Sequence, residues 1–347
     1  MKHIVAGLMA AALLSACGGG SSNPFEPAED GTPVDGGETP TDTVTPTTPV
    51  AVPAALAGNV QSISFDAQTG TVSVVGLNLD EVPITAIYRR RPGLDRDGYL
   101  AFTAQDDPLD RHFTAYVGQS NNSGAVRAGA VGSPGPRNRF FVGGFFERDG
   151  EYTPPSVTET TGLVSYAGKY VGVTNGSDAV GADLLAVPAG TPNELLVPQS
   201  NSVTGDVFVN ADFADNSVEG NIFNRRLIQS AADPESVTFP PIELPSLVLV
   251  STGITANGTF NGSVEYDLAD PRSNSPTPTS TGSYGGVFGG PNAEGVAGVV
   301  NLTGFDGVSN PLGFENELET GIFVLDQCGA AVSSPICATV NPDSGTP

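Results

Sequence analysis

Side chains able to do acid–base or nucleophilic chemistry are scarce in this chain. Beyond residue 17 there is a single histidine, His112, in the run Asp110-Arg111-His112. A catalytic triad built on histidine also needs a nucleophile and an orienting carboxylate, and histidine metal sites usually need several imidazoles. The chain also lacks a Gly-x-Ser-x-Gly elbow and a phosphate-binding Gly-x-x-x-x-Gly-Lys loop. We therefore interpret His112 as a lone surface histidine and predict that the protein is not an enzyme.

Two further patterns could hold a metal or a cofactor. Asp95-Arg96-Asp97-Gly98 is similar to a fragment of a calcium loop, but the later acidic ligands are missing. Haem needs axial ligands, and because no methionine follows residue 17, the candidates are His112, Tyr88, Tyr99 and Tyr116. We predict no metal site and no resident cofactor.

Arginine is concentrated in one part of the sequence. Nine of the twelve arginines lie between Arg89 and Arg148, and Arg89-Arg90-Arg91 is the densest point. Arginine forks bind carboxylates and stack on aromatic rings, so Arg89, Arg90 and Arg91 are candidate binding residues for a partner. The alternative is that these arginines pair inside the protein, either with the acidic second half of the chain or with Asp95, Asp97, Asp106, Asp107 and Asp110.

The chain as a whole is strongly acidic, with a formal net charge of −24 over 347 residues. Between Val157 and Asp326 there are 20 acidic residues against 4 basic ones. A nucleic-acid partner needs a basic footprint, so this charge argues against nucleic acid and against electrostatic docking on anionic lipid. A self-repelling, soluble surface is the simplest consequence.

The first residues have the form of an export signal. Ile4–Leu14 is apolar and too short to span a bilayer, and Leu14-Ser15-Ala16-Cys17 follows it. Small residues before a cysteine resemble the lipobox of bacterial lipoproteins. This implies a signal peptide over residues 1–16, cleavage before Cys17, and lipidation of Cys17 with diacylglycerol and a further acyl chain such as palmitate. Several chains give stable anchoring. Gly18 follows, so we expect the outer membrane.

Residues 17–55 are rich in Pro, Thr, Gly and acids and contain almost no large apolar residue. Such a segment cannot bury enough surface to offset its ordering entropy. We predict a lipidated, disordered tether with a reach of roughly 35 Å.

The rest of the chain predicts an all-β fold in two parts, because no stretch has helical periodicity with caps. Residues 56–155 form a β-rich handle domain, ending near Pro154-Pro155. Its expected strands are Val60–Phe65, Thr71–Gly76, Ile84–Arg90, Tyr99–Gln105, Phe113–Gly118, Ala125–Val131 and Arg139–Phe146.

Residues 156–328 predict an eight-stranded antiparallel β-barrel, the count at which side chains fill the interior of a small barrel. Its expected strands are Gly162–Val173, Val203–Phe213, Val218–Asn224, Leu247–Ile254, Gly258–Asp267, Gly282–Gly289, Gly295–Gly304 and Thr320–Asp326. Residues 329–347 form a C-terminal tail. We predict a disulfide between Cys328 and Cys337, because an exported chain meets an oxidising compartment.

One hairpin in the barrel region resembles a known family. Tyr284–Gly298 reads YGGVFGGPNAEGVAG, a Gly-aromatic-Gly strand, a Gly-Pro-x-Ala-Glu turn and a Gly-rich strand. This pattern resembles the barrel hairpin of transferrin-binding-protein-B-like bacterial surface lipoproteins. Thr161–Gly172 and the Cys17-Gly-Gly-Gly start are also similar. The resemblance implies a C-terminal barrel, an N-terminal handle and translocator-dependent display on the cell surface.

These features favour a surface-anchored outer-membrane lipoprotein that binds a macromolecular partner. The resemblance implies a role in nutrient acquisition or host interaction. Iron- or haem-carrying proteins or a TonB-dependent receptor are the candidate partners. The alternative is a structural or assembly lipoprotein that acts on a neighbouring envelope protein. The sequence decides neither the partner, nor its binding loops, nor the oligomeric state.

Overall fold

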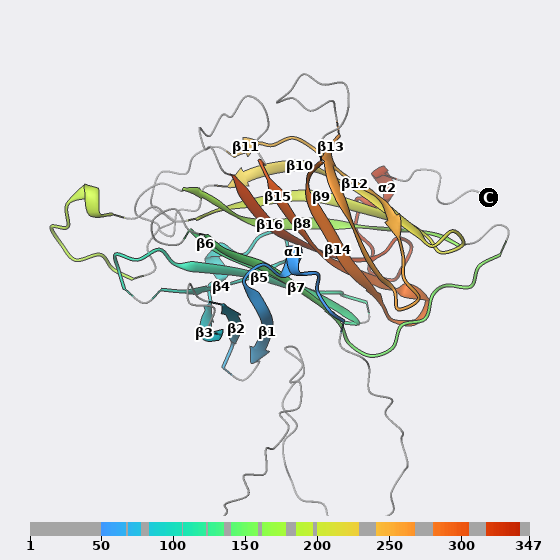
Figure 1. The fold of residues 1–347 in the computed structure, drawn as a ribbon, viewed down its shortest axis with the longest axis horizontal. Coiled ribbons are helices and arrows are strands. Elements are labelled where there is room, and N and C mark those ends of the chain that lie inside the picture. Colours follow the sequence, from blue (N-terminus) through green and yellow to red (C-terminus); the bar gives the residue numbers. More distant parts are fainter. Residues whose placement is uncertain are drawn as a thin grey trace, which may run out of the picture.

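Nearly all regular structure in this computed structural model is β (Figure 1). The model describes residues 50–66, 69–77, 83–105, 107–122, 124–134, 140–158, 162–177, 185–196, 200–228, 241–267, 280–304 and 317–340. The predicted signal peptide, Cys17 and the predicted tether up to residue 49 lie outside these described residues.

The handle is a single antiparallel sheet in which each strand pairs with the next one along the chain. Every strand expected in this region is present. The strands are β1 (Val60–Asp66), β2 (Thr71–Leu77), β3 (Pro83–Arg90), β4 (Leu100–Ala104), β5 (Phe113–Gln119), β6 (Val126–Pro134) and β7 (Phe140–Arg148).

The second part is a closed eight-stranded barrel, as predicted. The ladder runs β10-β12-β13-β14-β15-β16-β8-β9, and β9 pairs with β10 to close it. The strands are β8 (Leu163–Ser177), β9 (Ser200–Asp212), β10 (Ser217–Ile228), β12 (Leu247–Gly253), β13 (Thr259–Tyr266), β14 (Ser280–Gly289), β15 (Gly295–Thr303) and β16 (Leu318–Gln327). The two-residue strand β11 (Ile242–Glu243) flanks β10.

Helical elements in the described part of the chain are short. They are α1 (Ala54–Ala57), α2 (Cys337–Val340) and the 3-10 turns Pro92–Leu94, Asn193–Leu195 and Pro291–Ala293. Neither α-helix has the length or the apolar composition needed to cross a bilayer.

Three apolar cores follow from the alternation of side chains along these strands. One fills the barrel and includes Tyr166, Phe288 and Phe323. A second lies inside the curled handle sheet and includes Tyr88 and Phe102. The third joins the outer wall of the barrel to the other face of the handle. The handle therefore packs directly on the barrel, as Figure 1 shows.

The hairpin β14–β15 needs its glycines because large rings occupy the space beside them. A Cβ placed on Gly298 would lie 2.3 Å from Cζ of Phe323, and one placed on Gly286 would lie 2.6 Å from Cζ of Phe260. Real Cβ atoms do not approach heavy atoms so closely, so only glycine fits without displacing these aromatic rings.

The folded body begins a few residues earlier than the predicted start at Leu56. Val50 and Val52 pack against the core between handle and barrel, and Leu56 is fully buried there. The Asn301 amide on β15 donates to the carbonyls of Ala55 and Leu56. We call residues 50–57 the wedge, because they pack between the two parts of the body.

One end of the barrel interior contains a buried ion pair. Arg225 and Glu319 both have side chains that are 0% exposed, and Nη2 of Arg225 lies 2.5 Å from Oε2 of Glu319. The Tyr170 hydroxyl donates to the other carboxylate oxygen at 2.6 Å, and Nη1 of Arg225 donates to the Pro245 carbonyl at 2.7 Å. These bonds satisfy charges that would be very unfavourable alone in the barrel.

Candidate functional site

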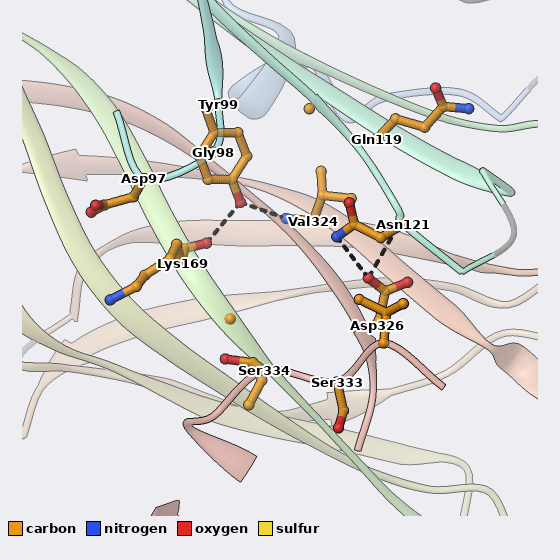
Figure 2. A pocket seen from close by; sticks show the side chains of 14 residues that line it. Asp97, Gly98, Tyr99, Gln119, Asn121, Lys169, Val324, Asp326, Ser333 and Ser334 are labelled. Carbon is orange, nitrogen blue, oxygen red and sulfur yellow. Dashed lines mark hydrogen bonds between the residues drawn. The ribbon is translucent and has the colours of Figure 1, made fainter. Parts of the chain in front are cut away.

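A cleft of about 240 Å³ opens where the handle meets the barrel wall (Figure 2). Five segments of the chain form it: the turn before β4, the end of β5, the barrel strands β8 and β16, and residues 332–334 of the C-terminal tail. Its lining is mostly polar at the rim, with Asp97, Gln119, Asn121, Lys169, Ser333 and Ser334. We call this hollow the interdomain cleft.

Tyr99 forms part of the cleft floor and bridges two barrel strands from outside. Its hydroxyl donates to the Lys169 carbonyl on β8 at 2.7 Å and accepts from the Val324 amide on β16 at 2.9 Å (Figure 2). The β8–β16 register omits two neighbouring pairs, Lys169 with Val324 and Gly168 with Leu325, although the ladder is present on both sides of this gap. A handle side chain thus replaces a ladder bond of the barrel.

Burial raises the pKa of Tyr99 above its usual range. The phenol therefore stays protonated and remains a hydrogen-bond donor at every physiological pH. The sequence singled out Tyr99 only as a haem-ligand candidate, and its bridging role was missed because it depends on a contact 225 residues away.

The right-hand wall of the cleft in Figure 2 joins the β5–β6 turn to the barrel. Asp326 accepts from the backbone amides of Asn121 and Asn122 and from the Asn121 side chain, at 3.0 to 3.1 Å. Asn122 also exchanges two hydrogen bonds with the backbone of Val332, at 2.8 and 2.9 Å. These contacts hold the C-terminal tail against the handle.

The tail itself is closed by a disulfide between Cys328 and Cys337, whose Cα atoms lie 5.6 Å apart. The bridged loop contains the residues that form one wall of the cleft. The disulfide therefore fixes a wall of the cleft as well as the end of the chain.

The three consecutive arginines differ in their contacts and in their exposure. Arg90 forms two hydrogen bonds of 2.6 Å with the Asp95 carboxylate, and its guanidinium lies 5.6 Å from the centre of the Phe102 ring. The alternative of internal pairing therefore holds for Arg90. Arg89 is exposed and Arg91 is half-buried, and neither forms an ion pair in the described part of the chain.

Most other handle arginines in the described residues hold the body together. Arg96 donates to Ser202 on β9 at 3.2 Å, and Arg148 donates to the carbonyls of Asn257 and Phe288 on the barrel. Arg127 is 3% exposed and pairs with Glu147 and Asp149 within the handle. The arginine cluster of the sequence is thus mainly a set of structural contacts.

The interpretation of His112 as a surface residue is wrong. Its side chain is 2% exposed, and its Nδ1 lies 3.1 Å from the Thr114 hydroxyl, a neighbour on the same face of the strand. No local pattern predicts this burial, because His112 lies just before β5 and its exposure depends on the tertiary fold.

The remaining candidates for ligand chemistry are enclosed or already bonded. Tyr88 and Tyr116 are 2% and 1% exposed, and burial raises the pKa of both hydroxyls. Asp95 binds Arg90 and the Ala101 amide, so its carboxylate is occupied. The described residues contain no group of three or more metal-ligating side chains.

Comparison with known proteins gives a limited result. No family model matches the chain, and no curated protein matches it. Among solved structures, intact Ap-TbpB with its N and C lobes matches 77% of this chain and 55% of its own, at 13% identity and a TM-score of 0.33.

Two further matches are of the same kind. A transferrin-binding protein B double mutant from Haemophilus parasuis has 13% identity, a TM-score of 0.32 and coverage of 76% of this chain and 52% of that one. The isotype 1 protein from serogroup B Neisseria meningitidis has 15% identity, a TM-score of 0.31 and coverage of 76% and 50%. This chain spans about half the length of these three structures.

All three structures belong to the family that the hairpin Tyr284–Gly298 resembles in sequence. TM-scores near 0.3 are too low to support an argument about function. What this protein does must therefore be inferred from its own residues.

Proposed function

We propose that this protein is a non-enzymatic binding protein, anchored by lipid on Cys17 to the outer membrane and displayed at the cell surface. Its partner is a macromolecule, for which iron- and haem-carrying proteins are the first candidates. The cleavage-site residues Leu14–Cys17 support the anchor, and the net charge of −24 makes nucleic acid an unsuitable partner.

One observation carries the binding role. In the described residues, the side chains that could act as acids, bases or ligands are bonded to one another or to the backbone. They lie inside a body in which handle and barrel are tightly joined. The handle, in contrast, presents exposed residues such as Ile87 and Arg89 on its outer side. A stable body with unused contacts at its surface suits recognition of another protein.

The binding role is tested by immobilising the purified full-length chain and passing iron-starved culture medium or host fluid over it. We expect recovery of one partner that saturates and competes with free protein. Repeated recovery of no saturable partner would contradict the proposal. A partner from the cell's own envelope would favour the assembly lipoprotein instead.

The anchor and the display are tested separately in cells. Cys17→Ser should move the protein from the membrane fraction to the soluble fraction, and protease added to intact cells should cut the wild-type protein. Full protection from protease while the outer membrane is intact would place the protein on the periplasmic side.

A further inference from the structure

The strand β3 has an edge that is only partly paired. Its pairing with β2 runs over the whole strand, from Pro83 to Arg89. On the other side, β4 pairs only with Arg89 and Arg90. Among the described residues, nothing pairs with this edge from Thr85 to Tyr88. We call Thr85–Arg89 the open edge, of which Arg89, at its end, already pairs with Thr103 on β4. Figure 1 shows β1, β2 and β3 at the lower end of the handle.

The direction of the backbone groups follows from a neighbouring hydrogen bond. The Arg91 amide donates to the Ala101 carbonyl on β4 at 2.8 Å. Because successive residues of a strand point their amides to opposite sides, Arg89, Ile87 and Thr85 also point theirs toward the β4 side. For Ile87 and Thr85 no described strand lies there, so these groups remain available to another chain.

Side chains on both faces of the open edge are suited to a contact. Thr85, Ala86 and Ile87 are all exposed, and Ile87 is 62% exposed. On the inner face, Tyr88 packs against the half-buried Phe113, with ring centres 6.2 Å apart. An added strand would therefore meet Ile87 on the outer face and the half-buried Phe113 ring on the inner face.

Natural proteins protect open strand edges with lysines, prolines or bulges, because an unprotected edge pairs with other chains. The strand begins with Pro83 on this same edge, but Thr85–Arg89 contains neither lysine nor proline, and its register with β2 is regular. Its only charge is Arg89, which is exposed and forms no ion pair in the described part of the chain. A carboxylate on the added strand would supply the missing partner.

We propose that the open edge of β3 binds an extended segment of the partner protein as an additional strand. The segment alternates apolar residues and carries an acidic residue opposite Arg89. This inference deepens the proposed function, on which it rests, by naming the mode of recognition. Main-chain hydrogen bonds supply affinity, while Ile87, Arg89 and the aromatic inner face select the sequence.

The test uses a phage library of random linear 12-residue peptides, selected on the full-length protein. Enriched peptides should alternate apolar residues and contain Asp or Glu. Ile87→Pro should weaken their binding at least about tenfold, because it removes the outward amide but no bond to β2. Ile87→Ala keeps the amide and should cost only about two- to threefold.

Arg89→Glu should weaken the same peptides about tenfold by reversing the charge. The matched control is Arg226→Glu, since Arg226 is an exposed arginine on β10 of the barrel, 55% exposed. Unchanged thermal unfolding in each variant shows that the fold is intact. Hydrogen exchange should show protection of the Ile87 amide when peptide binds.

Three results would overturn the inference: no enriched peptide, enriched peptides that bind Ile87→Pro as tightly as wild type, or an Ile87-dependent dimer of the protein itself in sedimentation. If a natural partner is recovered and binds the Ile87→Pro variant as tightly as wild type, this inference is contradicted while the proposed function stands. If peptides bind the open edge but no natural partner is ever recovered, the binding site is supported and the proposed function is contradicted.

Discussion

The barrel and the handle are both antiparallel sheets, and they differ in how many of their strand edges are paired. In the barrel, β9 pairs with β10, so each of the eight main strands has two neighbours. In the handle, β1 and β7 end the sheet and β3 leaves β4 after two residue pairs. The main barrel strands thus have partner strands along both edges, with gaps such as the one that Tyr99 bridges, whereas part of the β3 edge has no partner strand among the described residues.

Charged residues show the same difference. The barrel buries Arg225 and Glu319 completely within its interior. In the handle, Arg89 remains at the surface, Arg90 and Arg127 pair with acids of the handle itself, and Arg96 and Arg148 donate to neutral groups of the barrel. Under the proposed function, the barrel supplies stability and the handle supplies recognition.

The largest expected effect comes from breaking the barrel's buried ion pair. Arg225→Met leaves the Glu319 carboxylate buried without its cation, which should lower the free energy of unfolding by about 3–5 kcal/mol. Denaturant unfolding followed by circular dichroism measures this. The adjacent residue is the control: Arg226 is 55% exposed beside Glu243, which is 83% exposed, so Arg226→Met should change stability by no more than about 0.5 kcal/mol. Equal effects at the two positions would refute the distinction between them.

An intermediate effect is expected at the C-terminal loop. Replacing Cys328 and Cys337 together by serine opens a loop with a sequence separation of 9 and should cost up to about 2–3 kcal/mol. The tail would then hold Asn122 less firmly, so the Val332 amide should exchange faster with solvent. Unchanged exchange at Val332 would show that the disulfide does not support the wall of the cleft.

A smaller effect is expected from the bridge between the two parts. Tyr99→Phe leaves the Val324 amide and the Lys169 carbonyl without the hydroxyl, which should cost about 1–3 kcal/mol. Tyr152→Phe is the control, because Tyr152 is half-buried and forms no hydrogen bond through its hydroxyl in the described structure. A loss of the same size in both variants would mean that the bridge contributes nothing specific.

The pH dependence of stability at alkaline pH gives a second test of the Tyr99 bridge. Burial raises the pKa of Tyr99, so above about pH 10 the unfolded chain loses this proton while the folded chain keeps it. Folded protein then binds more protons, and its stability falls as pH rises, by about 1.4 kcal/mol per pH unit for each such tyrosine. Tyr99→Phe should therefore show a shallower fall than wild type between about pH 10 and 11. Parallel curves would contradict the burial of this phenol.

Local pattern was enough to predict the strands. Alternation and turn residues identified every strand of both sheets except the two-residue β11, and the eight expected barrel strands all belong to the closed ladder. Glycines in Gly282–Gly289 and Gly295–Gly304 also indicated a bent, closely packed hairpin, which the contacts of Gly298 with Phe323 explain.

Contacts between distant segments could not be predicted in the same way. His112 is 2% exposed in the folded body, and Tyr99 reaches Val324 across 225 residues of sequence. The Arg90–Asp95 pair was within reach of the sequence, since the two residues are five apart, and it was stated as the alternative. That Arg89 lies on an open edge depends on where β4 turns away, which no local pattern records.

The wedge has a mechanical consequence. The chain enters the folded body at Val50 and passes between handle and barrel, where Leu56 is buried and Asn301 holds the carbonyls of Ala55 and Leu56. Two residues later, the Asn59 amide is fixed to the Val142 carbonyl at 2.9 Å. A force applied to the chain before Val50 therefore acts on β15 and β7 together. It strains the contact between handle and barrel before it strains either sheet alone.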